Sequence, residues 1–555
     1  MKAIRTILLV ALVVSFGGAF GRAFAQAPDT IWVAASPAGN INDFIQGDTL
    51  GNGSRAHPNA VYKLYMDSIY YYTGTINVSF PLAIIADTGS SHRPPIIAPA
   101  ILQDNSSPST LFNVLSGARS FTFKNIYSTG VRPDQKVNNN YSNFVNIVGD
   151  STRFVFDNCV FDNLVGAAIV VGSGNYNKFF MTNCVFRNMI PYTQYFYGQA
   201  FLSGGGAPTD TVEMINNTFF CINAYADANV YYNTYTRFEH NTVFLTAVNP
   251  LNDFVMTNAV YKNNIFYGTA EEAQTQNEIL GDYQDDTPYG TSTFSFDSLN
   301  VYLPVATLGL SEGARKILVE NNSVFWSQTV RNFWATPLMD TLVPPYVFNG
   351  RTQRMFNNKT AWPGLYQAGN DSVADPGFLS AVTTQEDSLI KYVQLTRTNA
   401  LGTYLWDYDP GNAPLFPPAW PLPENLRYTN STFIHGGTDG YALGDLRWFP
   451  EQKATWVLGV KSQPNDIPTK FDLSSNYPNP FNPSTNIKVD LKQPGLMSLK
   501  VYNILGQLVK VVDEGYKQAG TYVYNVSMDQ YSSGVYFYTL QQGANSMTKK
   551  MMLLK

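Results

Sequence analysis

The sequence predicts an all-β chain in which a long parallel β-helix solenoid precedes a small antiparallel β-sandwich. An Asn-x-x-Phe phrase recurs between Asn158 and Phe325, mostly at steps of about 23 to 25 residues, a period typical of repeat solenoids. Short β-prone runs broken by Gly, Asn, Asp and Pro fill residues 58–318 without a helical period. Three short strands and three turns per coil would explain both observations.

The chain opens with the pattern of a secretory signal peptide, predicted as residues 1–25. A positively charged start is followed by an apolar run and by small residues up to Ala25. A membrane anchor is the alternative, but the apolar run is short and Gly17 and Gly18 break it. We therefore expect an exported mature chain without a transmembrane segment, in which residues 26–59 form an N-terminal cap.

Composition limits the chemistry. Charged residues make up 14% of the chain and the net charge is −5, so no basic stripe for nucleic acid is expected. The 3 cysteines and 4 histidines give neither a disulfide framework nor zinc-ligand spacing. Cys159 and Cys184 occupy matching slots of consecutive repeats, about 4.8 Å apart if the coils stack. Stacked free thiols are favoured, and a disulfide stays open.

If the coils stack, equivalent residues of successive repeats form two columns, one of asparagines and one of aromatic residues. Asparagine tolerates left-handed turns, and stacked amides can bond to one another along the axis. The position three residues later is predicted to form one aromatic ladder inside the tube: Phe161, Phe186, Phe220, Phe244, Tyr267 and Phe325. Asp162 and Arg187 follow this column in adjacent coils, and we expect an exposed ion pair worth at most about 1 kcal/mol rather than a catalytic pair.

The phrases at residues 154–161 and 179–186 resemble the right-handed parallel β-helix of the pectin-lyase-like superfamily. The resemblance covers residues 60–400 and leaves 401–460 as a C-terminal cap region. It implies architecture rather than substrate, although many members cleave acidic polysaccharides with Ca²⁺-binding carboxylates and a nearby Arg or Lys base. Lys and Arg are absent from residues 188–236, so no groove for a polyanion is expected there.

No catalytic constellation is identified, and the candidates come from departures from the repeat. Arg237, Glu239 and His240 combine a guanidinium, a carboxylate and an imidazole, but strand alternation would turn His240 away from the other two. A long insertion after residue 267 carries carboxylates that could bind Ca²⁺ or form a solvated acidic loop. The metal candidates there are Asp282, Asp285 and Asp286, with Glu271 and Glu272 nearby.

Aromatic insertions around the third repeat give a second kind of candidate. Rings on a loop could stack on sugar faces, whereas ordinary strand aromatics are the alternative. The candidate ligand-binding residues are Tyr192, Tyr195, Tyr197, Tyr231 and Tyr232.

A polar linker, residues 461–470, leads to a separate module at 471–555. Its strands alternate with Gly-centred turns and suggest an immunoglobulin-like antiparallel sandwich. The segments at 477–485 and 533–538 and the ending at 549–555 resemble the type A sorting domain of the type IX (Por) secretion system. A plain immunoglobulin-like spacer is the alternative. The resemblance implies recognition by that machinery and delivery to the outer-membrane surface or the medium.

The sequence thus predicts an exported β-helix protein that is a structural or carbohydrate-interacting module, with extracellular polysaccharide as the candidate partner. A polysaccharide lyase or glycosidase is the alternative, and whether the chain is an enzyme stays open.

Overall fold

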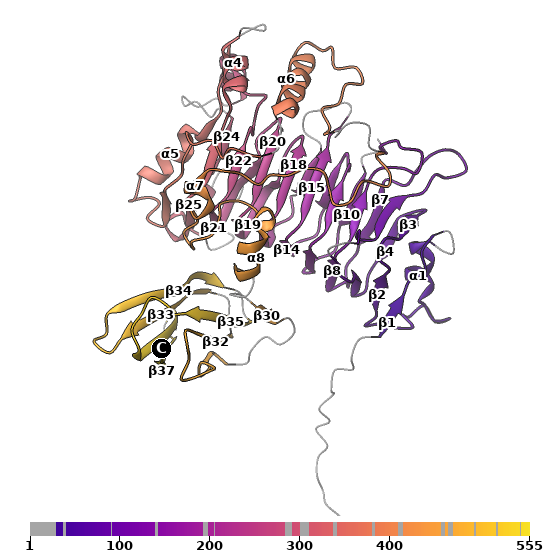
Figure 1. The fold of residues 1–555 in the computed structure, drawn as a ribbon. Coiled ribbons are helices and arrows are strands. Elements are labelled where there is room, and N and C mark those ends of the chain that lie inside the picture. The colour runs from indigo at the N-terminus through magenta and orange to yellow at the C-terminus, as the bar shows by residue number, and fades with distance from the viewer. Residues whose placement is uncertain are drawn as a thin grey trace, which may run out of the picture.

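The computed structural model describes residues 29–555 apart from short gaps, so the predicted signal peptide lies outside the described residues. The gaps are residues 37–39, 90–91, 139–141, 192–197, 205, 283–290, 300–309, 337–340, 380–382, 409–413, 457–460, 464–469, 493–494, 518–519 and 544. A parallel β-helix is followed by a small antiparallel module, as predicted (Figure 1). In the described part of the chain, no helix is long and apolar enough to cross a membrane.

Each complete coil contributes one strand to each of three faces, and equivalent strands of successive coils pair in parallel. The first face consists of β1 (Thr30–Trp32), β2 (Val61–Leu64), β5 (Leu82–Ala86), β8 (Ser120–Lys124), β11 (Arg153–Asp157), β14 (Lys178–Thr182), β17 (Thr209–Ile215), the ends of β19 (Asp227–Glu239) and β21 (Leu251–Lys262), β25 (Lys316–Glu320) and β29 (Leu365–Ala368).

The second face is a 9-stranded sheet that contains β3 (Ile69–Tyr72), β6 (Ile96–Pro99), β9 (Tyr127–Thr129), β12 (Val160–Asp162), β15 (Val185–Met189), β18 (Thr218–Ile222), β20 (Thr242–Thr246), β22 (Ile265–Tyr267) and β26 (Ser323–Phe325). The third face contains β4 (Ile76–Val78), β7 (Thr110–Val114), β10 (Asn143–Ile147), β13 (Ala167–Val171), β16 (Gln199–Ser203) and the starts of β19 and β21. Because β19 and β21 run through two faces, the first and third faces form one sheet.

The predicted single aromatic ladder is wrong by one residue at the third repeat. Phe186 pairs in register with Phe219, not Phe220. The inner ladder therefore runs Phe161, Phe186, Phe219, with ring centroids 5.0 and 5.1 Å apart. Neighbouring strand residues point to opposite faces, so Phe220 starts a second ladder on the outer side of the second face. That outer ladder continues through Phe244, Tyr267 and Phe325 at centroid spacings of 5.3, 5.2 and 5.5 Å.

The asparagines likewise form two columns, at the corner between the first and second faces. The first column has positive φ, between 52° and 58°, and its members are Asn125, Asn158, Asn183, Asn216, Asn263 and Asn321. The second is buried in the tube, where each side-chain amide donates to the carbonyl oxygen of the next at 2.8 to 3.2 Å: Asn217, Asn241, Asn264, Asn322 and Asn370. Both roles predicted for asparagine, the left-handed turn and the stacked amide, therefore occur. They are divided between two columns of adjacent residues, such as Asn216 and Asn217.

Cys159 and Cys184 stand in the buried column and are free thiols. Backbone pairing places Val160 opposite Val185, so the two cysteines precede paired residues. Burial and the neighbouring Cys159 raise the pKa of the Cys184 thiol well above its ordinary value. The Cys184 backbone N–H donates to Asn217 Oδ1 at 2.8 Å, which joins the thiols to the asparagine ladder.

Helices lie at the ends of the solenoid and in its insertions. The N-terminal helix α1 (Ile41–Gly47) buries Ile41 and Ile45 in the core and closes the first coil. Helix α2 (Gln276–Asp282) lies in a stretch where the sequence predicted no helix. The other elements around the last coils are β23 (Gln274–Thr275), β24 (Ser292–Phe294), η2 (Glu312–Ala314), α4 (Gln328–Ala335), β27 (Leu342–Val343), β28 (Tyr346–Phe348), α5 (Gly350–Asn357) and α6 (Thr383–Arg397).

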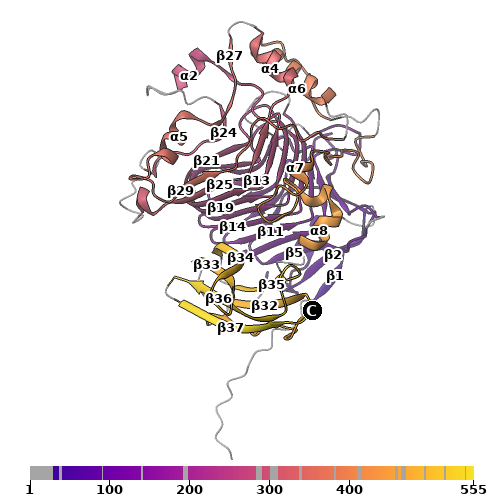
Figure 2. The ribbon, with the colours of Figure 1, turned by 60° about the vertical axis from the view of Figure 1, so that its left-hand side comes forward.

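Residues 414–456, here called the returning segment, run back along the outer side of the second face. They contain α7 (Ser431–Ile434), η3 (Leu446–Trp448) and α8 (Pro450–Trp456), seen against the side of the solenoid in Figure 2. Phe416 packs with Val160 and Val185, and Leu446 and Phe449 pack with Ile265. The predicted C-terminal cap region therefore covers a side of the solenoid, because the outward residues of these strands are apolar.

The C-terminal module is a sandwich of two 4-stranded antiparallel sheets. One contains β30 (Lys461–Gln463), β31 (Asp472–Leu473), β32 (Ser484–Leu491) and β35 (Gly520–Ser527). The other contains β33 (Gly495–Asn503), β34 (Leu508–Lys517), β36 (Gly534–Gln542) and β37 (Asn545–Leu553). Residues such as Val489, Leu499 and Tyr538 form its own core. The predicted linker thus starts with a strand of the sandwich.

Candidate functional site

His240 occupies the left-handed corner position at which six other coils have asparagine and the last coil has Gly369. Its φ is 51°, and it directly follows β19, which ends at Glu239. The imidazole takes the place of an amide in the column, since Asn263 Nδ2 lies 3.3 Å from His240 Nε2. Because the strand ends at Glu239, the predicted alternation that would turn His240 away from Glu239 does not apply. The turn places both side chains outside the tube.

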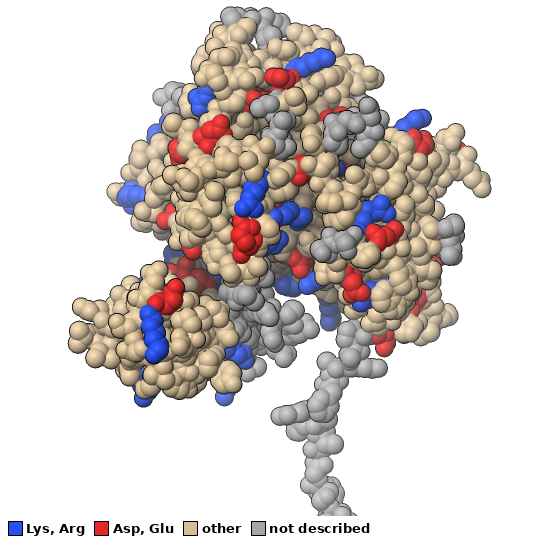
Figure 3. Space-filling model, in the orientation of Figure 1, with Lys and Arg blue, Asp and Glu red and all other residues tan. Residues whose placement is uncertain are grey.

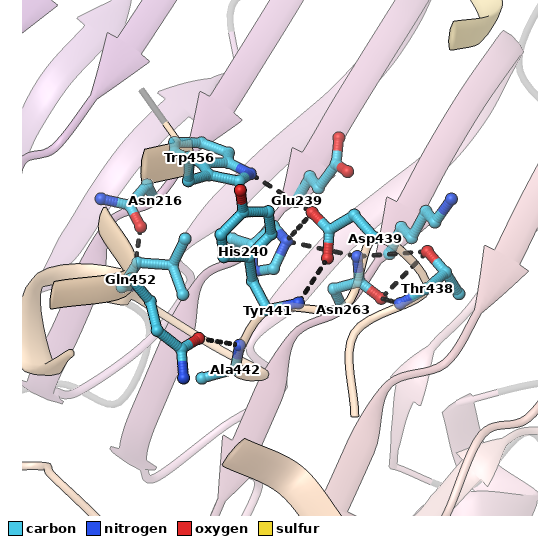
Figure 4. A network of polar contacts seen from close by, with 12 residues as sticks. Asn216, Glu239, His240, Asn263, Thr438, Asp439, Tyr441, Ala442, Gln452 and Trp456 are labelled. Atoms are coloured by element: carbon cyan, nitrogen blue, oxygen red, sulfur yellow. Dashed lines mark hydrogen bonds and ion pairs between the residues drawn. The ribbon is translucent and has the colours of Figure 1, made fainter. Parts of the chain in front are cut away.

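The returning segment covers the His240 ring completely, and the ring is 0% exposed. Asp439 Oδ2 lies 2.9 Å from Nε2, the carbonyl oxygen of Gly444 lies 3.3 Å from Nδ1, and the Trp456 ring is 5.4 Å away (Figure 4). Burial would lower the pKa of His240, but the hydrogen bond with Asp439 and its charge raise it above the ordinary value. The same contact lowers the pKa of Asp439 against the effect of burial.

Glu239 completes the cluster from the solenoid side. One ligand atom from each of Glu239, His240 and Asp439 lies within 4.8 Å of the others. Arg237 Nε donates to Glu239 Oε2 at 2.7 Å, and this pairing lowers the pKa of Glu239 despite its burial. The three residues singled out in the sequence are therefore brought together, and Asp439 is the partner that the sequence did not indicate. Both imidazole nitrogens of His240 thus contact groups of the chain: Nδ1 contacts the Gly444 carbonyl oxygen, and Nε2 contacts Asp439 and Asn263.

Asp162 and Arg187 form a buried ion pair, not the exposed one that was predicted. Arg187 Nη1 donates to Asp162 at 3.0 Å, and its Nε and Nη2 donate to Glu424 of the returning segment at 2.8 and 3.1 Å. Tyr127 adds a hydroxyl hydrogen bond to Asp162 at 2.7 Å. Burial would lower the pKa of Arg187, but the two carboxylates raise it. The prediction failed because a segment some 240 residues later covers the pair.

A second buried acidic group lies inside the tube. Asp253 accepts hydrogen bonds from the Asn229 backbone at 3.1 Å and from the Tyr261 hydroxyl at 2.8 Å. Asp227 is also 0% exposed and shares Asn229 as a donor, at 2.9 Å. Burial, followed by the charge of Asp253, raises the pKa of Asp227 well above its ordinary value. The pair is thus suited to holding a proton.

A cavity of about 280 Å³ opens beside the same corner, nearer the N-terminal end of the solenoid. Asn125 and Asn158 of the left-handed column contribute to it, Asp87 adds a carboxylate, His92 adds an imidazole, and Trp420 of the returning segment adds an aromatic ring. Its other lining residues are Met66, Thr88, Gly89 and Pro94. Charges on the face shown in Figure 3 are sparse and of mixed sign, so no single-sign patch gathers there.

The tyrosine candidates divide into two groups. Tyr192, Tyr195 and Tyr197 lie outside the described residues. Tyr231 and Tyr232 lie in β19, where Tyr232 packs with Val255 and Leu299 and is only 6% exposed. Its hydroxyl contacts Thr257 at 2.6 Å. Tyr232 therefore offers almost no ring surface to a ligand, because burial uses its face as core.

The acidic insertion is described only in part. Asp282 is the last residue of α2, and Asp285 and Asp286 lie outside the described residues. Glu271 is 0% exposed, and neither of its carboxylate oxygens has a hydrogen-bond partner among the described residues. Burial raises its pKa well above the ordinary value. Glu272 lies 3.9 Å from Arg397, and burial raises its pKa to about 7.

The C-terminal sandwich supplies the decisive comparison. Residues 475–554 match the family model of the secretion system C-terminal sorting domain. The matched range spans the strands from β32 to β37 and both sheets of the module. The sorting domain indicates export by the type IX secretion system to the cell surface or the extracellular space. Comparisons with curated proteins and with solved structures give no match for the chain.

Proposed function

We propose that the solenoid is a carbohydrate-binding module that the sorting domain delivers outside the cell. The observation that carries this proposal is the cavity that Trp420 lines together with Asn125, Asn158 and Asp87. An aromatic ring beside a few convergent polar groups suits a sugar, which has an apolar face and a rim of hydroxyls.

The size and charge of the cavity support a short, weakly held saccharide. Its volume of about 280 Å³ is near the lower limit of ligand pockets. Asp87 is 64% exposed and forms an ion pair with Lys63 at 2.6 Å, and His92 pairs with Asp67 at 2.6 Å. The carboxylate that lines the cavity is thus paired with Lys63, and no Lys or Arg is among the lining residues, which favours a neutral glycan over a polyanion.

The test is retention of the purified full chain on a glycan array. Trp420→Ala should reduce retention about tenfold or more, because the aromatic wall and its desolvated contact area are lost. Tyr366→Ala is the matched control, since that ring is 54% exposed on β29 at the other end of the solenoid. Equal retention by Trp420→Ala and the parent chain would refute the cavity as the binding site.

We propose the aromatic insertion that carries Tyr192, Tyr195 and Tyr197 as a second place where the chain contacts a glycan. Exchanging Tyr195 for alanine tests it separately from the cavity. A polysaccharide lyase or glycosidase activity remains the alternative function. The chain is incubated with acidic and neutral polysaccharides to test this alternative. If unsaturated uronic ends or new reducing ends accumulate, the enzymatic function replaces the binding function proposed above.

A further inference from the structure

We propose that Glu239, His240 and Asp439 bind one divalent transition-metal ion of the Zn²⁺ class, which ties the returning segment to the solenoid. The inference is independent of carbohydrate binding, because the cluster shares no residue with the cavity beside Trp420. It requires only the contacts at the corner between the first and second faces.

The orientation of the imidazole is the first argument. Histidines that bind metals commonly donate one ring N–H to a carbonyl or carboxylate and present the other nitrogen to the ion. Here Nδ1 lies 3.3 Å from the Gly444 carbonyl oxygen, and Nε2 lies 2.9 Å from Asp439 Oδ2. In the tautomer with its proton on Nδ1, the lone pair of Nε2 faces Asp439 and the side-chain amide of Asn263, which lies 3.3 Å away (Figure 4), and a Glu239 carboxylate oxygen lies within 4.8 Å.

The place of His240 in the repeat is the second argument. The corner needs a residue that accepts positive φ, and asparagine meets that need in six other coils and Gly369 in the last one. Asparagine also supplies the hydrogen bonds between coils, such as Asn216 Nδ2 to Asn183 Oδ1 at 2.8 Å. An imidazole is therefore unnecessary for the turn, and it stands at the one corner where two carboxylates converge among the described residues.

The carboxylates keep atoms available for an ion. Arg237 engages Glu239 through Oε2, so Oε1 is left to act as a ligand. Asp439 Oδ1 accepts from the Tyr441 backbone N–H at 3.2 Å, and Oδ2, which lies toward the ring, also accepts from Trp456 Nε1 at 3.2 Å and keeps a second lone pair for an ion. One imidazole with two carboxylates suits Zn²⁺, Mn²⁺ or Ni²⁺ better than Ca²⁺, which prefers all-oxygen sites.

Asp439 is the most exposed of the three proposed ligands, while the Glu239 side chain is 12% exposed. The His240 side chain is 0% exposed, whereas Asp439 is 31% exposed. An ion would thus enter past Asp439 and keep a water as its fourth ligand. Because Asp439 belongs to the returning segment and the other two ligands belong to the solenoid, the ion would hold these parts together.

The experiment titrates the chelator-stripped full chain with ZnCl₂ by calorimetry. We expect one ion per chain. His240→Asn should weaken its binding about 100-fold or more, while it places the column's own residue at the corner and so preserves the turn. His57→Asn is the matched control, because His57 is an exposed histidine paired with Asp48, and it should bind as the parent chain does.

A second variant and a second readout keep the test decisive if His240→Asn folds poorly. Asp439→Asn retains the shape of the side chain but removes its charge, and it should weaken binding to a similar degree. Zn²⁺ should also protect residues 430–456 from proteolysis in the parent chain and not in either variant. Absence of Zn²⁺ uptake, or equal uptake by the parent chain and both variants, would overturn the proposal.

Discussion

Loss of Arg187 should be far more damaging than loss of its partner in the returning segment. Asp162 and Glu424 are both 1% exposed at their side chains, and Arg187 is the cation between them. Arg187→Met leaves two buried carboxylates that face one another without a cation. Breaking a buried ion pair in this way costs about 3–5 kcal/mol.

Glu424→Gln should lower the free energy of unfolding by less than Arg187→Met does. The remaining Asp162–Arg187 pair is neutral overall, and the glutamine oxygen still accepts one of the two guanidinium hydrogen bonds, now 2.8 and 3.1 Å long. One charge-assisted hydrogen bond is lost, which we estimate at about 1.5–3 kcal/mol. Adding Glu424→Gln to Arg187→Met should then recover part of the larger loss, because one of the two buried negative charges disappears.

Local measurements suit this comparison, since a long solenoid need not unfold in one step. Hydrogen exchange of the amides in β15 and limited proteolysis of the returning segment both report opening at the site. We expect exchange to rise most in Arg187→Met, less in the double variant and least in Glu424→Gln. A larger effect of Glu424→Gln than of Arg187→Met would refute the charge argument.

Three further predictions concern other parts of the chain. Asn264→Leu should destabilise the solenoid by about 3 kcal/mol or more, measured by denaturant titration, because the Asn241 N–H and the Phe238 carbonyl lose their partners. Asp227 has a higher pKa in the folded chain than its unfolded value of 3.8. The free energy of unfolding should therefore be greatest below pH 3.8 and should fall by up to about 1.4 kcal/mol per pH unit until the pH has passed the folded pKa. Melting curves of Asp227→Asn should lack this slope, and an unchanged slope would contradict the shared proton. Deletion of residues 471–555 should trap the chain in the periplasm, and surface labelling that detects normal delivery would contradict a sorting role.

The repeat made the solenoid predictable, because coil-to-coil contacts are local in sequence and each coil must present the same turn and core residues. The asparagine phrase, the phenylalanines and the separate C-terminal module could all be recognised in this way. The exact columns could not be predicted, because Asn216 and Asn217 each stand three residues before a phenylalanine and so both fit the phrase. Only backbone pairing of Phe186 with Phe219 decides which asparagine turns the corner and which lies in the tube.

By itself, then, the sequence determined the fold class, the sorting module and the three residues Arg237, Glu239 and His240 as an unusual group. The tertiary structure decided what those residues face. Asp439, Glu424 and Trp420 all belong to the returning segment, and their partners lie roughly 200 to 330 residues earlier. No local pattern encodes such contacts, because they depend on the path that the chain takes back along the second face. That path buries a pair expected at the surface and completes both candidate sites.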